Sequence, residues 1–375
     1  MFGRSFPLFR LLGFQIKADT SWIFLAALIV WSLAKGYFPT ALPGQDAGTY
    51  WQMAVVGAAG LFGSLILHEL AHSVVARRYG LPISGITLFL FGGVAEMKEE
   101  PRSARVEFNV AVAGPLMSFF LAILFYLIGR LLEGAGTAGA VAAVVVYLAT
   151  INIILAVFNL VPAFPLDGGR MFRAFLWWRS GDFAAATRTA TASGQNFGLV
   201  LIGLGIFFIV TGNVGAGIWQ LVLGLFLRAA ATASMQQMVT KNALEGVPVA
   251  QFMTRDPVTV PATLTIDGFV RDYLLGGHHT GFPVVADGTP VGYVSVRHAK
   301  AAPRDQWSQL TVADVCDRLG PDNSVDPSMD AHDALVLMGR TGKRKVLVVD
   351  RGRLVGLLAL SDLAGFLSVR AELEI

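Results

Sequence analysis

The segment SLILHELAHSVVARRYG, from Ser64 to Gly80, places two histidines and a glutamate inside a stretch that otherwise has the composition of a membrane-crossing helix. A charged side chain at the middle of such a helix costs roughly 2.5–3.5 kcal/mol on insertion scales, so these groups are expected to have a function. His68 and His72 are one helical turn apart, and their imidazoles therefore project from one face and can bind the same ion.

The pattern H-E-x-x-H on a helix indicates a zinc site. Two imidazole nitrogens and one carboxylate leave a fourth tetrahedral position for water, whose pKa falls to about 7 on a catalytic zinc. Glu69 is then expected to accept the proton of that water and to pass it to the leaving amine. The alternative, a chance match in an ordinary helix, fits poorly with the apolar surroundings. We predict one zinc ion, with a third ligand from elsewhere in the chain.

The composition of the 375-residue chain, 54% hydrophobic and 15% charged, is typical of a membrane protein. Its apolar runs lie in roughly the first two thirds, so the remainder is expected to form a separate soluble unit. The net charge of +3 is small and dispersed, which argues against nucleic acid as a partner. The single cysteine, Cys316, excludes an internal disulfide and fits a reducing compartment.

Crossing the hydrocarbon core of a lipid bilayer takes about 20 apolar residues in a helix. The sequence predicts six crossings, at 21–36, 53–79, 106–132, 139–161, 195–211 and 214–233. The first, fifth and sixth are short or interrupted, and Asn213 is the strongest turn signal between the last two, so a count of five stays open.

Lysine and arginine residues are distributed unequally between the two ends of these spans. Only Lys35 and Arg130 fall on one side, and the more basic side is cytoplasmic by the positive-inside rule. We predict a multi-pass protein of the inner membrane with both termini in the cytoplasm. The residues on the basic side are Arg4, Arg10, Lys17, Arg77, Arg78, Lys98, Arg102, Arg105, Arg170, Arg173, Arg179, Arg188, Arg228 and Lys241.

The third ligand is expected from NLVPAFPLDGGRMFRA, Asn159–Ala174, at the cytoplasmic end of the fourth span. Its two prolines break the helix, and an unwound segment at that depth is tolerated where it lines a cavity. Asp167, beside glycines that let the backbone turn closely, is the candidate carboxylate ligand, and Asn159 could hydrogen-bond a substrate carbonyl. The alternative for Asp167 is a helix N-cap for the segment that follows.

HELAH in one span and NLVPAFPLDGG in a later one resemble the two signature motifs of the site-2 protease family, intramembrane zinc metalloproteases that cut within or near transmembrane helices. The resemblance covers roughly residues 14–233. It implies that His68, His72 and Asp167 are the metal ligands, that Glu69 is the catalytic base, and that Asn159 is the motif asparagine that handles substrate.

Between the second and third spans, ISGITLFLFGGVAEMKEEPRSARVEF has β-branched and aromatic runs on either side of Gly92 and Gly93, which predicts a membrane-associated β-hairpin. A protease cuts only an extended backbone, so we expect the substrate to add as a strand to this hairpin at Gly92 and Gly93. A packed structural loop is the alternative.

In AVAGPLMS of the third span, Gly114 and Pro115 predict a kink at which helices approach closely.

After a linker at 234–246 the sequence repeats itself, in copies at about 247–305 and 310–375. Each copy has the pattern of a strand, a helix, two strands joined by a turn, and a closing helix. The pair resembles tandem CBS domains. The turns are Asp287-Gly288 in the first copy and Arg351-Gly352 in the second.

CBS pairs often bind adenine nucleotides through a threonine or serine followed three residues later by an aspartate, and each copy keeps half of that motif. VGYVSVRH has Ser295 but His298 at the aspartate position, and VGLLALSD has Asp362 but Ala359 at the hydroxyl position. The resemblance therefore implies ATP or AMP as a possible ligand and a homodimer formed through the CBS domains. A pair that only dimerises or packs on the membrane part is the alternative.

Together these features predict a polytopic α-helical membrane protein with a β-hairpin and a cytoplasmic α/β tandem CBS module. The predicted function is a zinc endopeptidase that cuts a single-span or membrane-anchored protein. A transporter gated by CBS domains is one alternative, but it should show duplicated spans with matching breaks, and the sequence has one H-E-x-x-H and one L-D-G-G. A noncatalytic membrane scaffold that senses nucleotide is another, and it would not need Glu69.

Overall fold

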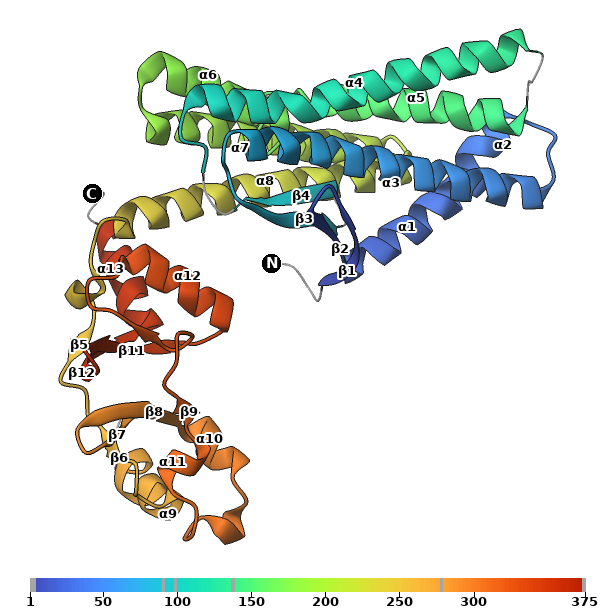
Figure 1. The fold of residues 1–375 in the computed structure, drawn as a ribbon. Coiled ribbons are helices and arrows are strands. Elements are labelled where there is room, and N and C mark those ends of the chain that lie inside the picture. The colour runs from blue at the N-terminus through green and yellow to red at the C-terminus, as the bar shows by residue number, and fades with distance from the viewer. Residues whose placement is uncertain (1–4, 90–91, 98–99, 136–138, 277–278, 373–375) are drawn as a thin grey trace. The chain divides into compact units, whose positions relative to one another are not determined.

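The computed structural model describes residues 5–89, 92–97, 100–135, 139–276 and 279–372. The chain divides into two compact units, Met1–Met235 and Gln236–Ile375. The first unit is mainly helical, and the second alternates short strands with short helices (Figure 1).

Among the described residues, six helical segments of the chain are long and apolar enough to cross a membrane, and each predicted span falls on one of them. The turn predicted between the last two spans is present, because Gly212 separates them with a φ of +91°. This favours six crossings over five. The segments are α1 with its extension (Thr20–Ala41, comprising α1 at Thr20–Ser32, a π-helical turn at Leu33–Tyr37 and α2 at Phe38–Ala41), α3 (Ala47–Arg78), α4 (Ala104–Gly134), α5 (Ala140–Asn159), α7 (Phe183–Val210) and α8 (Val214–Leu244).

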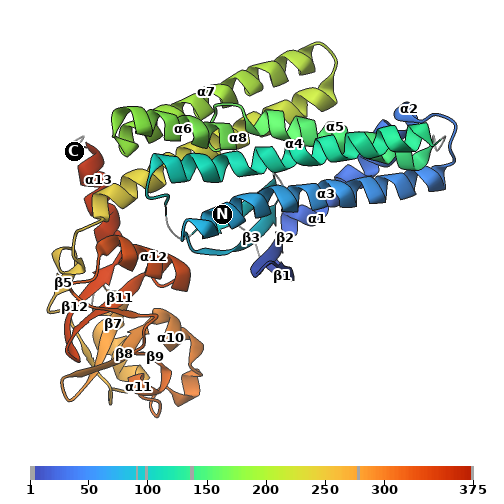
Figure 2. The same ribbon diagram turned by 45° about the horizontal axis from the view of Figure 1, so that its top comes forward.

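Helices α3, α4 and α5 run side by side and pack against one another (Figures 1 and 2). Small residues allow this approach, since a Cβ at Gly60 of α3 would lie 2.7 Å from the Leu148 side chain of α5. A buried polar contact joins the same two helices, Asn152 donating from Nδ2 to Ser64 Oγ at 3.0 Å. The helix that carries H-E-x-x-H is therefore fixed one turn before His68.

A four-stranded sheet covers part of α3, in the order β1-β2-β3-β4. The predicted hairpin around Gly92 and Gly93 is the pair β3 and β4. Strands β1 and β2 at the N-terminus were not predicted from the sequence, and β2 pairs in parallel with β3. Ile16 and Ile86 are fully buried in the cluster that joins the sheet to Leu70 of α3. The strands are β1 (Ser5–Leu11), β2 (Phe14–Asp19), β3 (Ile83–Phe89) and β4 (Gly92–Met97).

The chain leaves α5 at Asn159 and runs through an irregular segment, 160–166, before α6 (Asp167–Ser180) begins. This agrees with the helix break predicted from Pro162 and Pro165. The predicted linker differs from the structure in one respect, because α8 continues without interruption to Leu244. Leu244 itself is fully buried in a core cluster of the second unit.

The second unit contains two copies of one arrangement, as the repeat predicts. Both predicted turns have the left-handed backbone that a two-residue hairpin requires, with φ of 48° at Asp287 and at Arg351. The first copy contains β5 (Thr254–Arg255), β6 (Val260–Pro261), α9 (Ile266–Gly268), β7 (Gly281–Ala286), β8 (Thr289–Ser295) and α10 (Val296–Ala301). The second contains α11 (Val312–Val315), β9 (Asp317–Arg318), β10 (Ser324–Val325), α12 (Ala331–Thr341), β11 (Lys345–Asp350), β12 (Arg353–Ala359) and α13 (Leu360–Glu372).

The two copies exchange their first strands. One sheet has the order β6-β7-β8-β9 and the other β10-β11-β12-β5. Strand β9 from the second copy therefore pairs with β8, and β5 from the first copy pairs with β12. A cut between residues 305 and 310 would take one strand from each sheet.

Candidate metal centre

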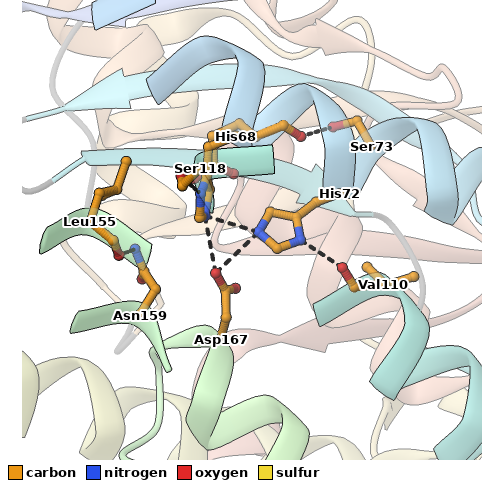
Figure 3. A network of polar contacts seen from close by, with 9 residues as sticks. His68, His72, Ser73, Val110, Ser118, Leu155, Asn159 and Asp167 are labelled. Carbon is orange, nitrogen blue, oxygen red and sulfur yellow. Dashed lines mark hydrogen bonds and ion pairs between the residues drawn. The ribbon is translucent and has the colours of Figure 1, made fainter. Parts of the chain in front are cut away.

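The structure brings together the three residues predicted as metal ligands. His68, His72 and Asp167 are buried, and one ligand atom from each lies within 4.8 Å of the others. Asp167 Oδ2 is 3.0 Å from His68 Nε2 and 3.2 Å from His72 Nε2, and the two Nε2 atoms are 3.2 Å apart. Figure 3 shows the three side chains pointing toward one another.

This arrangement fits a zinc ion. Ligand atoms at about 2.0–2.1 Å from a tetrahedral zinc are separated by about 3.3 Å, close to the separations observed here. The donor set, two imidazoles and a carboxylate, is the kind that catalytic zinc sites use. Both Nδ1 atoms face other partners, Ser118 Oγ for His68 at 2.8 Å and the Val110 carbonyl for His72 at 2.6 Å. Both Nε2 atoms are thereby left to face the ion.

Asp167 reaches this position because two glycines let α6 start against the irregular segment. A Cβ at Gly168 would lie 2.2 Å from the Leu160 carbonyl oxygen, and one at Gly169 would lie 2.2 Å from the Phe164 nitrogen. Asp167 is the first residue of α6, and the N-cap is Leu166, with no side-chain cap. The alternative of Asp167 as an N-cap is therefore wrong.

A second network, not predicted from the sequence, holds α6 in place. Arg173 of α6 donates from Nε to Glu107 of α4 at 2.7 Å, and its guanidinium lies 4.9 Å from the ring centres of Phe164 and Phe183. Glu107 is 0% exposed. The signal in the sequence was an acidic residue at the start of an apolar span, Glu107, with no opposite charge one turn away.

Glu69 and Gly93 lie against each other. Glu69 is half-buried on α3, and a Cβ at Gly93 of β4 would lie 2.6 Å from its Cγ. Gly92 has a φ of +136°, which only glycine adopts readily. The predicted base therefore lies against one of the two predicted substrate-binding glycines, Gly93, at the start of β4.

Asn159 is half-buried at the last residue of α5, and Figure 3 shows it near Asp167. Its Nδ2 donates to the Leu155 carbonyl of its own helix at 2.9 Å. The structure therefore shows this amide hydrogen bonded within α5.

In the second unit, both residues predicted to bind nucleotide cap helices. Ser295 and His298 form a reciprocal capping box at the start of α10, and Asp362 accepts from the Ala359 nitrogen at 3.0 Å at the start of α13. His298 Nε2 also lies 3.4 Å from Asp317, to which Lys343 donates a hydrogen bond. Burial raises the pKa of Asp317, but the bond and charge of Lys343, with His298, outweigh it and hold this pKa below its usual range.

The sequence matches known families over both units. The model of Peptidase family M50 matches residues 56–141 and 133–204, and the CBS domain model matches 249–304 and 312–369. Rip3 of Mycobacterium tuberculosis, named as a candidate zinc metalloprotease, is 36% identical over 367 residues, which cover 97% of this chain and 93% of Rip3. A zinc metalloprotease of Methanocaldococcus jannaschii is 27% identical, with 97% of this chain and 96% of that protein covered. The solved structure of the site-2 protease from M. jannaschii matches 62% of this chain and 95% of its own, at 26% identity and a TM-score of 0.43.

Proposed function

The chain belongs to the site-2 protease family, peptidase family M50, and is a multi-pass membrane zinc metalloprotease with tandem CBS domains; from this premise we propose that His68, His72 and Asp167 hold its zinc and that Glu69 is its general base. The observation that carries the assignment is the convergence of three buried ligand atoms from α3 and α6. The family assignment also removes the transporter and the noncatalytic scaffold as alternatives.

The proposed chemistry is hydrolysis of a peptide bond. When bound, zinc supplies a polarised water and a Lewis acid for the scissile carbonyl. Glu69 follows His68 directly on α3, and in the H-E-x-x-H pattern the role proposed for its carboxylate is to reach the water on the zinc. It takes a proton from the attacking water and gives it to the nitrogen of the leaving amine. His68, His72 and Asp167 are all buried, which limits the access of bulk water to them.

We infer that the substrate binds as a strand along β4. Within the described residues β4 is an edge of the sheet, paired with β3 alone. Because Gly93 lies against Glu69, a backbone paired with the outer edge of β4 would pass beside the base. A transmembrane substrate must first unwind, and pairing with β4 satisfies the amide groups that unwinding exposes.

Proline substitutions on β4 test this binding mode. A proline at Leu88 would not be informative, because Leu88 is buried in the internal strand β3 and a proline there would disrupt the sheet itself. Successive N–H groups of β4 point alternately to β3 and to the free edge. Of the variants Val94→Pro and Ala95→Pro, only one removes an N–H that points to the free edge of β4. That variant should retain zinc and lose cleavage. Undiminished cleavage by both variants would exclude strand addition.

Asn159 is proposed to bind a substrate carbonyl after its amide turns away from Leu155. The predicted effect of Asn159→Ala is a higher KM with an unchanged zinc content, because Asn159 is not one of the three proposed ligands. A normal KM would remove Asn159 from substrate binding.

The proposed orientation puts both termini and the CBS domains in the cytoplasm of the inner membrane, on the basis of the lysine and arginine distribution. A cysteine placed at the exposed Asp322 in a Cys316→Ser background should react with an impermeant maleimide in inverted vesicles and not in intact spheroplasts. The opposite labelling pattern would reverse the topology.

Regulation by ATP or AMP through the CBS domains, within a homodimer, is also proposed. Asp362 is the candidate for the ribose hydroxyls and Ser295 for a second contact, and each would have to share its capping role with the ligand. Calorimetry of the full chain with ATP and AMP, compared with Asp362→Asn, tests binding, and light scattering tests the dimer. No heat with either nucleotide would leave the CBS pair a structural module.

The central experiment combines zinc analysis with cleavage of single-span reporter proteins by wild type and Glu69→Gln. The variant should retain zinc and lose roughly 100- to 10,000-fold in cleavage rate, the range for a general base. Undiminished cleavage would remove Glu69 from the mechanism.

A further inference from the structure

One face of α4 lines the candidate metal centre. Val110, Gly114 and Ser118 are four residues apart, so they share a side of the helix. The first and last contact the histidines, Val110 through its carbonyl to His72 and Ser118 through its hydroxyl to His68. Gly114 lies between these contacts and presents no side chain to the imidazoles.

The contact to Val110 determines which nitrogen of His72 carries hydrogen. A carbonyl oxygen can only accept, so His72 Nδ1 must be the donor in the 2.6 Å contact. In a neutral imidazole the other nitrogen, Nε2, then has the free lone pair. Nε2 is the atom that faces Asp167. The backbone of α4 thus prepares His72 to bind a metal ion.

The contact to Ser118 is different because it depends on a side chain. Ser118 is 0% exposed and His68 is 2% exposed, so bulk water cannot take the place of the hydroxyl. We propose that Ser118 is a positioning residue for His68, whose Nδ1 hydrogen its hydroxyl accepts, so that Nε2 is the nitrogen turned to the metal. This proposal rests on the metal ligands assigned above.

Loss of the hydroxyl has a defined consequence. His68 would lose the only acceptor that the described residues give its Nδ1. The tautomer protonated at Nε2, which cannot bind a metal through that nitrogen, would then become competitive. Removing such a partner from a ligating histidine typically lowers metal affinity about 10- to 100-fold.

Two variants of the same shape separate the hydrogen bond from packing. Threonine and valine have nearly the same shape, and valine has a methyl group where threonine has its hydroxyl. Zinc affinity of the purified full-length chain in detergent is measured by competition with a chelator. Ser118→Thr should bind zinc nearly as tightly as wild type, whereas Ser118→Val should bind it about 10- to 100-fold more weakly.

The matched control is Ser73→Ala on α3. Ser73 is also 0% exposed, but its hydroxyl donates to the Glu69 carbonyl of its own helix at 2.9 Å, so its loss should leave zinc affinity unchanged. The absorption spectrum of the cobalt-substituted chain gives a second readout, which should change in Ser118→Val and not in Ser73→Ala.

The outcomes separate this proposal from the ligand assignment. Equal affinities in Ser118→Thr and Ser118→Val would overturn the positioning role while leaving the ligands in place. Should His68→Ala bind zinc as tightly as wild type, the ligand set itself would be wrong. If Ser118→Val does not fold, Ser118→Ala replaces it in the comparison with Ser118→Thr, and equal affinities would again overturn the proposal.

Discussion

Arg173 and Glu107 form an ion pair at the contact between α6 and α4, with Arg173 Nε 2.7 Å from Glu107 Oε1 and the carboxylate 0% exposed. Asp167 stands at the start of the same α6. The pair therefore connects the helix that supplies the carboxylate ligand to the helix whose face contacts both histidines.

Glu107→Ala should destabilise the membrane unit strongly, because it leaves a buried guanidinium without its partner. Removal of one member of a buried pair costs about 3–5 kcal/mol. Denaturant unfolding of the purified chain in detergent measures the change. Glu133→Ala is the control, since its pair with Arg130 on the same helix is about half exposed and should contribute less than about 1 kcal/mol. Equal effects of the two substitutions would contradict the assignment.

Gly114→Ala should abolish zinc binding. The added Cβ would lie 2.2 Å from His72 Nε2 and 2.5 Å from His68 Nε2, so both imidazoles would have to move from their present positions. Gly129→Ala, also on α4, meets its nearest neighbour at 3.7 Å and should bind zinc normally. Zinc content by elemental analysis compares the two. A full complement of zinc in Gly114→Ala would show that the imidazoles can be accommodated elsewhere.

Gly93→Ala should lower the cleavage rate while zinc content stays normal. Its Cβ would lie 2.6 Å from Glu69 Cγ and displace the base rather than a ligand. A misplacement of about 1 Å can cost roughly 100-fold in rate. Gly63→Ala on α3, with open space at the Cβ position, is the control. Normal cleavage by Gly93→Ala would mean that Glu69 can function from another position.

The second unit should lose stability in acid partly through Asp317. Its pKa in the folded chain lies below its usual range, mainly because Lys343 outweighs the effect of burial. The stabilisation is thus complete above the unfolded pKa of about 3.9 and is lost as the pH falls through the lower folded value. Hydrogen exchange of residues 236–375 in the full chain should show a steeper loss of protection below about pH 4 in wild type than in Asp317→Asn. Asp322→Asn, at an exposed position, should behave like wild type; an identical acid profile for all three would rule out this role.

The sequence predicted the chemistry of the metal centre better than its surroundings. His68 and His72 are four residues apart on one helix, so their shared face follows from helix geometry alone. Asp167 is 95 residues beyond His72, and it was found because proline and glycine mark the helix break that delivers it. The contacts of Ser118 and Val110 with the histidines could not be predicted in this way. A single serine in an apolar helix matches no motif, and the Val110 contact is made by a backbone carbonyl, which is the same for every residue type.

Non-local pairing explains what was missed in the sheet. The hairpin of β3 and β4 is local and was predicted from Gly92 and Gly93. The strands β1 and β2 depend on the parallel pairing of Ile16 with Ile86, seventy positions later, which periodicity does not report. Gly114 shows a related limit, because a glycine before a proline predicts a kink, whereas the structure places it where any larger residue would meet both imidazoles.

Because β5 and β9 are exchanged between the two CBS copies, the two copies depend on each other and form one structural unit. A gene truncated after residue 305 would encode β8 without β9 beside it and β5 without β12. If either CBS copy were lost or replaced alone, the sheet of the remaining copy would lose the strand that the other copy supplies. A single copy on its own would lack one strand of its sheet, and the first strand of another such copy could fill that place.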